Sequence, residues 1–231
     1  MCGIAGLIAF DGENDRPERR LIAYEMGEKL NHRGPDEEGQ WACNHGVLVH
    51  RRLPVMDPAH CNQPLVRRRG RHEFAIVSNG ELCNAPALRR ELTTKGWTLE
   101  TDCDAEALLL AYMEWGEACA SRLEGVYAFA IWDGIRERFF LCRDRFGVKK
   151  LFYARAADGT LLFGSETRAL FAYPGFPPQS NGDDLCEALE PDPAHTAGCG
   201  VFAGVKELEP AYCIRVTRSG MRSWRYWRPD A

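Results

Sequence analysis

Apolar segments in this 231-residue chain come in pairs that short turn signals separate, and this pairing constrains the fold more than any other feature. The clearest pairs are residues 126–132 with 139–142 around Asp133-Gly134, and residues 151–153 with 161–163 around Asp158-Gly159. Two apolar runs around a short Gly-containing turn are typical of antiparallel hairpins. Two helical patterns also follow one another, at residues 86–92 and 105–115. Strands in hairpins and grouped helices predict the α+β class with antiparallel sheets.

Further elements follow from the same patterns. Three more strands are expected, at residues 4–10, 47–50 and 74–77, the last leading into a turn at Asn79-Gly80. A helix that begins at Pro17 places four apolar side chains on one face: Leu21, Ile22, Met26 and Leu30. Prolines interrupt the stretch after residue 173, where we expect only a short helix at 183–189 and a final strand pair at 211–216 and 221–227. We predict one domain, with a core at 2–172 and a C-terminal extension at 173–231.

Composition excludes several classes of partner. The formal net charge is −4, and the densest basic run has no aromatic residues between its arginines, Arg67, Arg68, Arg69 and Arg71. We interpret this run as a solvated hairpin tip, because binding to single-stranded nucleic acid needs stacking side chains beside the charges. No apolar run approaches the length of a membrane span. We therefore expect neither a nucleic-acid nor a membrane partner, and a cytoplasmic location.

Ten cysteines are many for such a chain, but none forms a C-x-x-C pair, which argues against a metal site. The chain is long and has a full apolar complement, which argues against a disulfide scaffold. We expect most of these cysteines to be small buried hydrophobic residues.

Cys2 differs from the others because it follows the initiator methionine directly and precedes Gly3. Removal of Met1 would place an α-amine and a thiol on one residue. An α-amine has a pKa of about 8, so it can act as the general base for its own side chain. Cys2 is then a candidate N-terminal nucleophile. The tripeptide Met1-Cys2-Gly3 does not by itself exclude the alternative, that a cysteine stands second by chance.

Motifs farther along the chain bear on that choice. After Met1-Cys2-Gly3-Ile4, seven motifs follow in order: N-H-R-G-P-D at 31–36, H-R-R-L-P-V-M-D at 50–57, Q-P at 63–64, S-N-G-E-L-C-N at 78–84, T-D-C-D-A-E at 101–106, L-C-R-D-R-F-G at 141–147 and F-G-S-E at 163–166. This series resembles the class II glutamine amidotransferases, which are N-terminal-nucleophile hydrolases. The resemblance implies an αββα sandwich in which helices flank two antiparallel sheets.

The resemblance also implies a role for each site residue. Catalysis would use Cys2, Asn79 and Gly80, and glutamine would contact Arg52, Leu53, Pro54, Val55, Met56, Asn79, Gly80, Glu81 and Asp104. These residue types suit the substrate. An arginine can form a fork with the α-carboxylate, two carboxylates can hold the ammonium, and an amide with a glycine N–H can receive an oxyanion.

Plainer interpretations exist for the same residues. Asn79-Gly80 alone would be a hairpin turn, Asp104 a helix N-cap and Arg52 a surface arginine. We expect structural roles for His32 and His50, because the α-amine already supplies a base.

Among families with this domain, the motifs look most like the glutaminase half of glutamine-hydrolysing asparagine synthetase. We expect L-glutamine as substrate and no cofactor in this chain, with ATP and magnesium used only by a synthetase half outside it. That half would be another domain or a subunit in trans, and a homodimer is left open. Departures from the family pattern at Pro54, Ser78, Cys61, Cys83, Cys103 and Lys150 keep a second hypothesis open, a weak or inactive scaffold domain with another acceptor.

Overall fold

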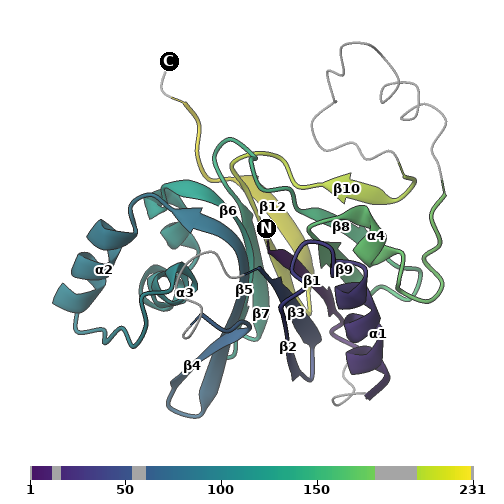
Figure 1. The fold of residues 1–231 in the computed structure, drawn as a ribbon, viewed down its shortest axis with the longest axis horizontal. Helices are drawn as coiled ribbons and strands as arrows, with labels where there is room; N and C mark the ends of the chain where they lie inside the picture. The colour runs from purple at the N-terminus through teal and green to yellow at the C-terminus, as the bar shows by residue number, and fades with distance from the viewer. Residues whose placement is uncertain (1, 12–16, 54–60, 180–201, 230–231) are drawn as a thin grey trace.

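The computed structural model describes residues 2–11, 17–53, 61–179 and 202–229, and consists of two antiparallel sheets with helices on their outer faces (Figure 1). Each sheet has six strands among these residues. The predicted α+β class and the αββα sandwich are confirmed.

The first sheet has the strand order β10-β8-β9-β1-β3-β2. Its strands are β1 (Gly3–Ile8), β2 (Glu37–Cys43), β3 (Gly46–Arg52), β8 (Phe152–Arg155), β9 (Leu161–Gly164) and β10 (Val205–Glu207). Every residue of β1 and β3 is buried, since these strands lie in the middle of the sheet and both of its faces are covered. The N-terminal strand is therefore among the most fixed parts of the fold.

The second sheet has the strand order β12-β11-β7-β6-β5-β4. Its strands are β4 (Leu65–Arg69), β5 (His72–Leu82), β6 (Gly125–Asp133), β7 (Arg138–Arg143), β11 (Tyr212–Thr217) and β12 (Gly220–Arg225). The C-terminal extension thus supplies strands to both sheets, and the predicted final strand pair is confirmed.

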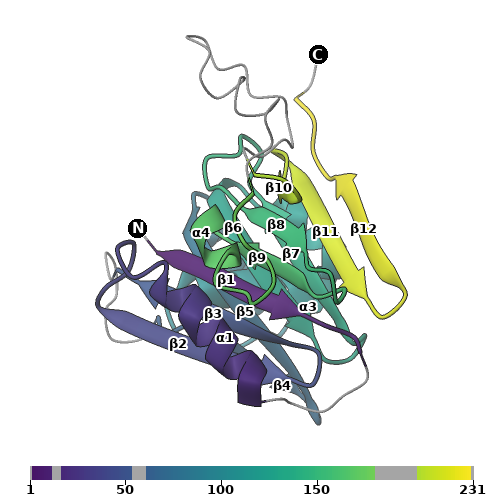
Figure 2. The same cartoon turned by 90° about the vertical axis from the view of Figure 1, so that its right-hand side faces the viewer.

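Helices cover the two outer faces (Figures 1 and 2). They are α1 (Pro17–Glu28) and α4 (Thr167–Leu170) on the first sheet, and α2 (Ala85–Thr94) and α3 (Asp104–Trp115), followed by the 3-10 helix η1 (Gly116–Arg122), on the second. Buried apolar side chains form three clusters, one between the sheets and one under each helical layer. None of the described helices is long and apolar enough to span a membrane.

Two sequence predictions are wrong in detail, and three strands were not predicted. Leu21 is 62% exposed and does not belong to the buried face of α1, which uses Ala23 and Met26. Asn79 and Gly80 do not form a turn, because they lie within β5, opposite Ala128 and Tyr127 of β6. The strands that were not predicted are β2, β4 and β10.

The basic run at the β4–β5 hairpin is only partly a solvated tip. Arg67 forms an ion pair with Glu106, whose side chain is fully buried. Glu106 also accepts hydrogen bonds from the backbone of Glu100 and Thr101. Arg67 therefore ties β4 to the segment that leads into α3. The predicted helix at 183–189 lies outside the described residues.

Candidate active site

Cys2 lies at the start of β1, beside a cavity of about 260 Å³ between the two sheets. The cavity is lined by every predicted site residue that the structure describes: Cys2, Arg52, Leu53, Asn79, Gly80, Glu81 and Asp104. They come from both sheets and from α3, so the tertiary fold brings together residues about a hundred positions apart in the sequence. Pro54, Val55 and Met56 lie outside the described residues.

Cys2 is partly exposed and lines this cavity. The Sγ atom of Cys2 lies 3.9 Å from the carbonyl oxygen of Leu53. Cys2 is not part of a disulfide. A thiol that is reachable and fixed at the end of a buried strand can meet a substrate carbonyl in a reproducible geometry.

Asn79 and Gly80 provide donors on the opposite wall. Asn79 is only 2% exposed, and its Nδ2 has no hydrogen-bond partner within the described part of the chain. Gly80 has φ of 141°, and a Cβ there would lie 2.0 Å from the carbonyl oxygen of Val126. Only glycine fits this backbone position. A buried amide donor without a partner is costly, so an incoming oxygen that accepts its hydrogen bond would be stabilised strongly.

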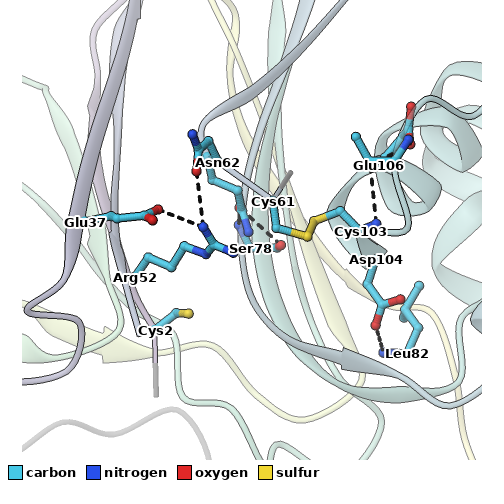
Figure 3. Close-up of a disulfide and its surroundings, with 12 residues drawn as sticks. Cys2, Glu37, Arg52, Cys61, Asn62, Ser78, Leu82, Cys103, Asp104 and Glu106 are labelled. Atoms are coloured by element: carbon cyan, nitrogen blue, oxygen red, sulfur yellow. Dashed lines mark hydrogen bonds and ion pairs between the residues drawn. A yellow bond between two sulfur atoms is a disulfide. The ribbon is translucent and has the colours of Figure 1, made fainter. Parts of the chain in front are cut away.

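Arg52 stands at the end of β3 and is 4% exposed. Its Nη1 donates to Glu37 at 2.8 Å and to Asn62 Oδ1 at 3.1 Å (Figure 3). It is therefore not a surface arginine. These contacts hold the planar guanidinium at the cavity wall, where it can meet a carboxylate.

Asp104 is the first residue of α3, and its Oδ2 accepts a hydrogen bond from the Leu82 N–H at 2.8 Å. The N-cap position belongs to Cys103, so the N-cap interpretation of Asp104 is wrong. Burial raises the pKa of Asp104, and the hydrogen bond from Leu82 offsets this only in part. A cationic ligand would favour the ionised carboxylate, as expected for a group that receives an ammonium. Glu81, at the rim, is exposed.

Two sequence motifs form a framework around Cys2. Arg33 Nε donates to the carbonyl oxygen of Cys2 at 3.1 Å, and its Nη1 donates to Glu166 Oε1 at 2.8 Å. His32 Nε2 lies 3.0 Å from the same carboxylate oxygen. Ser165 binds both backbone groups of Ile4, at 3.0 and 2.8 Å. The N-H-R-G-P-D and F-G-S-E motifs therefore position the first residues of β1.

We expect Glu166→Gln to lower kcat for glutamine hydrolysis about tenfold with little change in KM, since small misplacements of a reacting group are costly. Burial alone would raise the pKa of Glu166, but hydrogen bonds from Arg33 and His32 lower it, so the wild-type carboxylate is ionised near neutral pH. Arg168→Ala is the matched control, because Arg168 contacts the other carboxylate oxygen of Glu166. Equal kcat values in wild type and Glu166→Gln would contradict this positioning role.

The two histidines near the site fit structural roles. His50 is 1% exposed, and burial lowers its pKa to about 3. An imidazole with that pKa is too weak a base to activate a thiol near neutral pH. His32 belongs to the Glu166 framework described above.

The structure corrects the expectation for the cysteines. Cys61 and Cys103 form a disulfide with a Cα–Cα distance of 5.4 Å, and both line the cavity. Among the other described free cysteines outside the cavity, Cys119, Cys142 and Cys213 are buried as expected, whereas Cys43 is only partly buried and Cys83 is exposed. Spacing alone could not reveal the pairing, because the two residues are 42 positions apart and meet only in the folded chain.

Comparison with known families agrees with this geometry. A family model described as a glutamine amidotransferase domain matches residues 1–227. The chain belongs to this family. This membership confirms the family that the sequence motifs predict.

Curated relatives of this amidotransferase domain include asparagine synthetases. It is 36% identical to asparagine synthetase [glutamine-hydrolyzing] 3 of Bacillus subtilis, over 100% of this chain and 37% of that protein. It is 35% identical over 170 residues to asparagine synthetase B of Escherichia coli, covering 74% of this chain and 30% of that protein. The chain therefore spans about a third of the length of these relatives.

A solved structure shows the same fold. The glutamine phosphoribosylpyrophosphate amidotransferase of Bacillus subtilis superposes with a TM-score of 0.71, at 20% identity, over 99% of this chain and 50% of that one.

Proposed function

We propose that this amidotransferase domain hydrolyses L-glutamine to glutamate and ammonia, with Cys2 as an N-terminal nucleophile after removal of Met1. The observation that carries the proposal is the buried Nδ2 of Asn79, a donor without a described partner on the wall of the cavity that also holds Cys2. Such a donor suits the charge that develops when a thiolate attacks an amide carbonyl.

The proposed reaction proceeds in two steps. The α-amine of Cys2 takes the thiol proton, and the thiolate attacks the side-chain amide carbon of glutamine. Asn79 and the Gly80 N–H receive the oxyanion. The intermediate collapses with transfer of a proton to the leaving nitrogen, which releases ammonia and leaves a thioester. Water then attacks the thioester, and glutamate leaves as the thiol is restored.

The amino-acid end of the substrate is held by charge. Arg52 would bind the α-carboxylate from the first sheet, and Asp104 with Glu81 would bind the ammonium from the other wall. These contacts place the scissile amide between Cys2 and Asn79. Removing a substrate contact of this kind changes binding, because the interaction exists before the chemical step begins.

We expect Arg52→Ala to raise the KM for glutamine roughly 30-fold or more, because a charged carboxylate loses its partner. Arg51→Ala is a matched control. Arg51 is the preceding residue of β3 and is also buried, but it pairs with Glu28 and Glu38 instead of lining the cavity. Steady-state measurement of ammonia release gives both constants. An unchanged KM in Arg52→Ala would exclude the assigned role.

The ammonia acceptor is proposed from the relatives. Their names point to asparagine synthesis, so we propose that ammonia passes to a synthetase component that uses ATP and magnesium, either in the remainder of a longer chain or in a second chain.

Treatment with an electrophilic glutamine analogue tests the proposed hydrolysis. We expect the analogue to add once per chain, at Cys2, and to stop ammonia release, as measured by peptide mapping and a glutamate assay. Excess L-glutamine should protect the thiol. A protein that releases no ammonia above background and is not labelled at Cys2 would instead be a scaffold domain.

A further inference from the structure

The Cys61–Cys103 disulfide joins two segments that line the candidate glutamine cavity (Figure 3). Figure 3 shows Cys2 and Arg52 on one side of the disulfide and Asp104 on the other. Cys61 immediately precedes Asn62 and Gln63, and Cys103 immediately precedes Asp104. The covalent bond therefore joins two short segments that each carry polar groups of the site.

The Cys61 segment supports the side of the cavity assigned to the carboxylate. Asn62 Oδ1 accepts a hydrogen bond from Arg52 Nη1 at 3.1 Å. Gln63 Oε1 accepts one from the Ser78 N–H at 2.6 Å, which fixes this segment against β5. A shift at Cys61 would therefore reach Arg52 through a single intervening side chain.

The Cys103 segment supports the side assigned to the ammonium. Arg89 Nη2 donates to the carbonyl oxygen of Cys103 at 2.6 Å, and Asp104 accepts from the Leu82 N–H. As the N-cap of α3, Cys103 makes no side-chain hydrogen bond to the helix. Its side chain instead serves the cross-link, which fixes where α3 begins and hence where Asp104 stands.

We propose that Cys61 and Cys103 are a thiol–disulfide modification site that sets the affinity of the cavity for glutamine. The oxidised form holds Arg52 and Asp104 at the spacing of one amino acid, whereas the reduced form lets the Cys61 and Cys103 segments move apart. This inference rests on the proposed function, since it concerns the same cavity.

Formation of the cross-link requires an oxidant, and a small disulfide such as oxidised glutathione is suitable. One cysteine thiolate attacks a glutathione sulfur, which forms a mixed disulfide and releases one glutathione thiolate. The second cysteine thiolate attacks the protein-bound sulfur and releases the other glutathione. The two protons from the cysteines pass to the glutathione thiolates. A small dithiol reverses these steps.

The cavity provides the route for this exchange. Cys61 is partly exposed, whereas Cys103 is only 5% exposed, and both line the cavity. A small thiol can therefore reach the sulfur of Cys61 first. Bound glutamine would occupy the same space, so we expect substrate to slow reduction of the disulfide.

Loss of the cross-link is expected to change one kinetic constant more than the other. Cys2 directly precedes β1, and Asn79 and Gly80 lie on β5, so all three are outside the two joined segments. Loss of the cross-link should therefore raise KM with little effect on kcat. Pre-organised contacts gain affinity by reducing the ordering that binding requires, so we expect an increase in KM of roughly tenfold.

The experiment compares the protein after equilibration with oxidised glutathione and after reduction with dithiothreitol. Alkylation and peptide mapping should find Cys61 and Cys103 cross-linked only in the oxidised sample. KM should be about tenfold lower in that sample for wild type, and should not respond to redox state in Cys61→Ser/Cys103→Ser. Cys83→Ser, which alters an exposed free cysteine, should behave as wild type.

Two results would overturn the inference: no cross-link in the oxidised sample, or equal KM values in the two samples. Neither result would contradict the proposed hydrolysis of glutamine. If neither sample hydrolyses glutamine, the proposed function fails, and calorimetric titration of glutamine into both samples decides the inference. Affinity that differs about tenfold supports it, and equal affinity or no binding overturns it.

Discussion

Cys2→Ala is expected to reduce glutamine hydrolysis to the uncatalysed background, the largest effect of any single change in this chain. In the proposed reaction the thiol of Cys2 forms the covalent bond to the substrate, so its removal abolishes the first chemical step. Loss of a catalytic nucleophile lowers kcat by about 10⁴-fold or more in comparable hydrolases. Ammonia release measured at saturating glutamine checks this expectation.

The fold should survive the same substitution. Cys2 is partly exposed, and its one described side-chain contact is the long approach of its Sγ to Leu53. The change removes no core volume, so the melting temperature should stay within a few degrees of wild type. Cys2→Ser adds a second test, since a hydroxyl of similar size is a much weaker nucleophile than a thiolate.

Cys83→Ala is the matched control for the alanine variant, because it removes another accessible thiol that lies outside the cavity. It should retain wild-type kcat. Activity that persists in Cys2→Ala after purification, at more than a few per cent of wild type, would mean that another group carries the reaction.

The paired apolar segments are enough to predict the α+β class, and the resemblance carried by the ordered motifs implies the sandwich and a glutamine site. Its residue types suit the parts of glutamine, which is why they can be expected to share one cavity. Arg52, Asn79, Gly80 and Asp104 all line it.

Predictions from local sequence patterns are wrong where tertiary contacts determine the conformation or the exposure of a residue. Asn79-Gly80 has the composition of a hairpin turn, yet pairing with β6 over nine residues holds it in an extended strand. Leu21 fits the helical period of α1 but faces outward, because the contact face of α1 is set by the packing of β1 and β3. A sequence does not show which strand will lie beneath a helix.

The framework around Cys2 was also beyond sequence reasoning. Glu166 is over 130 positions from Arg33, and nothing in either motif indicates that they share an ion pair. The same holds for Cys61 and Cys103, whose pairing depends on the approach of the residues just before β4 to the start of α3. Such contacts depend on distances between elements, which periodicity does not encode.

Asn79→Leu is expected to separate catalysis from stability. The substitution nearly preserves side-chain shape and removes the amide that would stabilise the oxyanion. Loss of one such donor lowers kcat by about 10²–10³-fold, with a smaller effect on KM. Hydrolysis rates at saturating glutamine provide the measurement.

Although Asn79→Leu should lower kcat, we expect it to leave the stability of the fold unchanged or to raise it. The Nδ2 of Asn79 is buried without a partner in the described chain, so the folded protein gains nothing from it in the absence of substrate. Replacing an unsatisfied polar group by an apolar group of the same shape is neutral or stabilising. The melting temperature of Asn79→Leu should therefore equal or exceed that of wild type.

Asn84→Leu is a matched control for which we expect the reverse result: lower stability and an unchanged kcat. Asn84 donates to the carbonyl of Arg122 at 2.8 Å and accepts from the Glu124 N–H at 3.1 Å, so its amide is bonded on both sides. Its loss should cost about 1–3 kcal/mol of folding free energy and leave kcat unchanged. If Asn79→Leu instead melts several degrees lower and keeps its kcat, the amide of Asn79 is structural, and the oxyanion must be held elsewhere in the cavity.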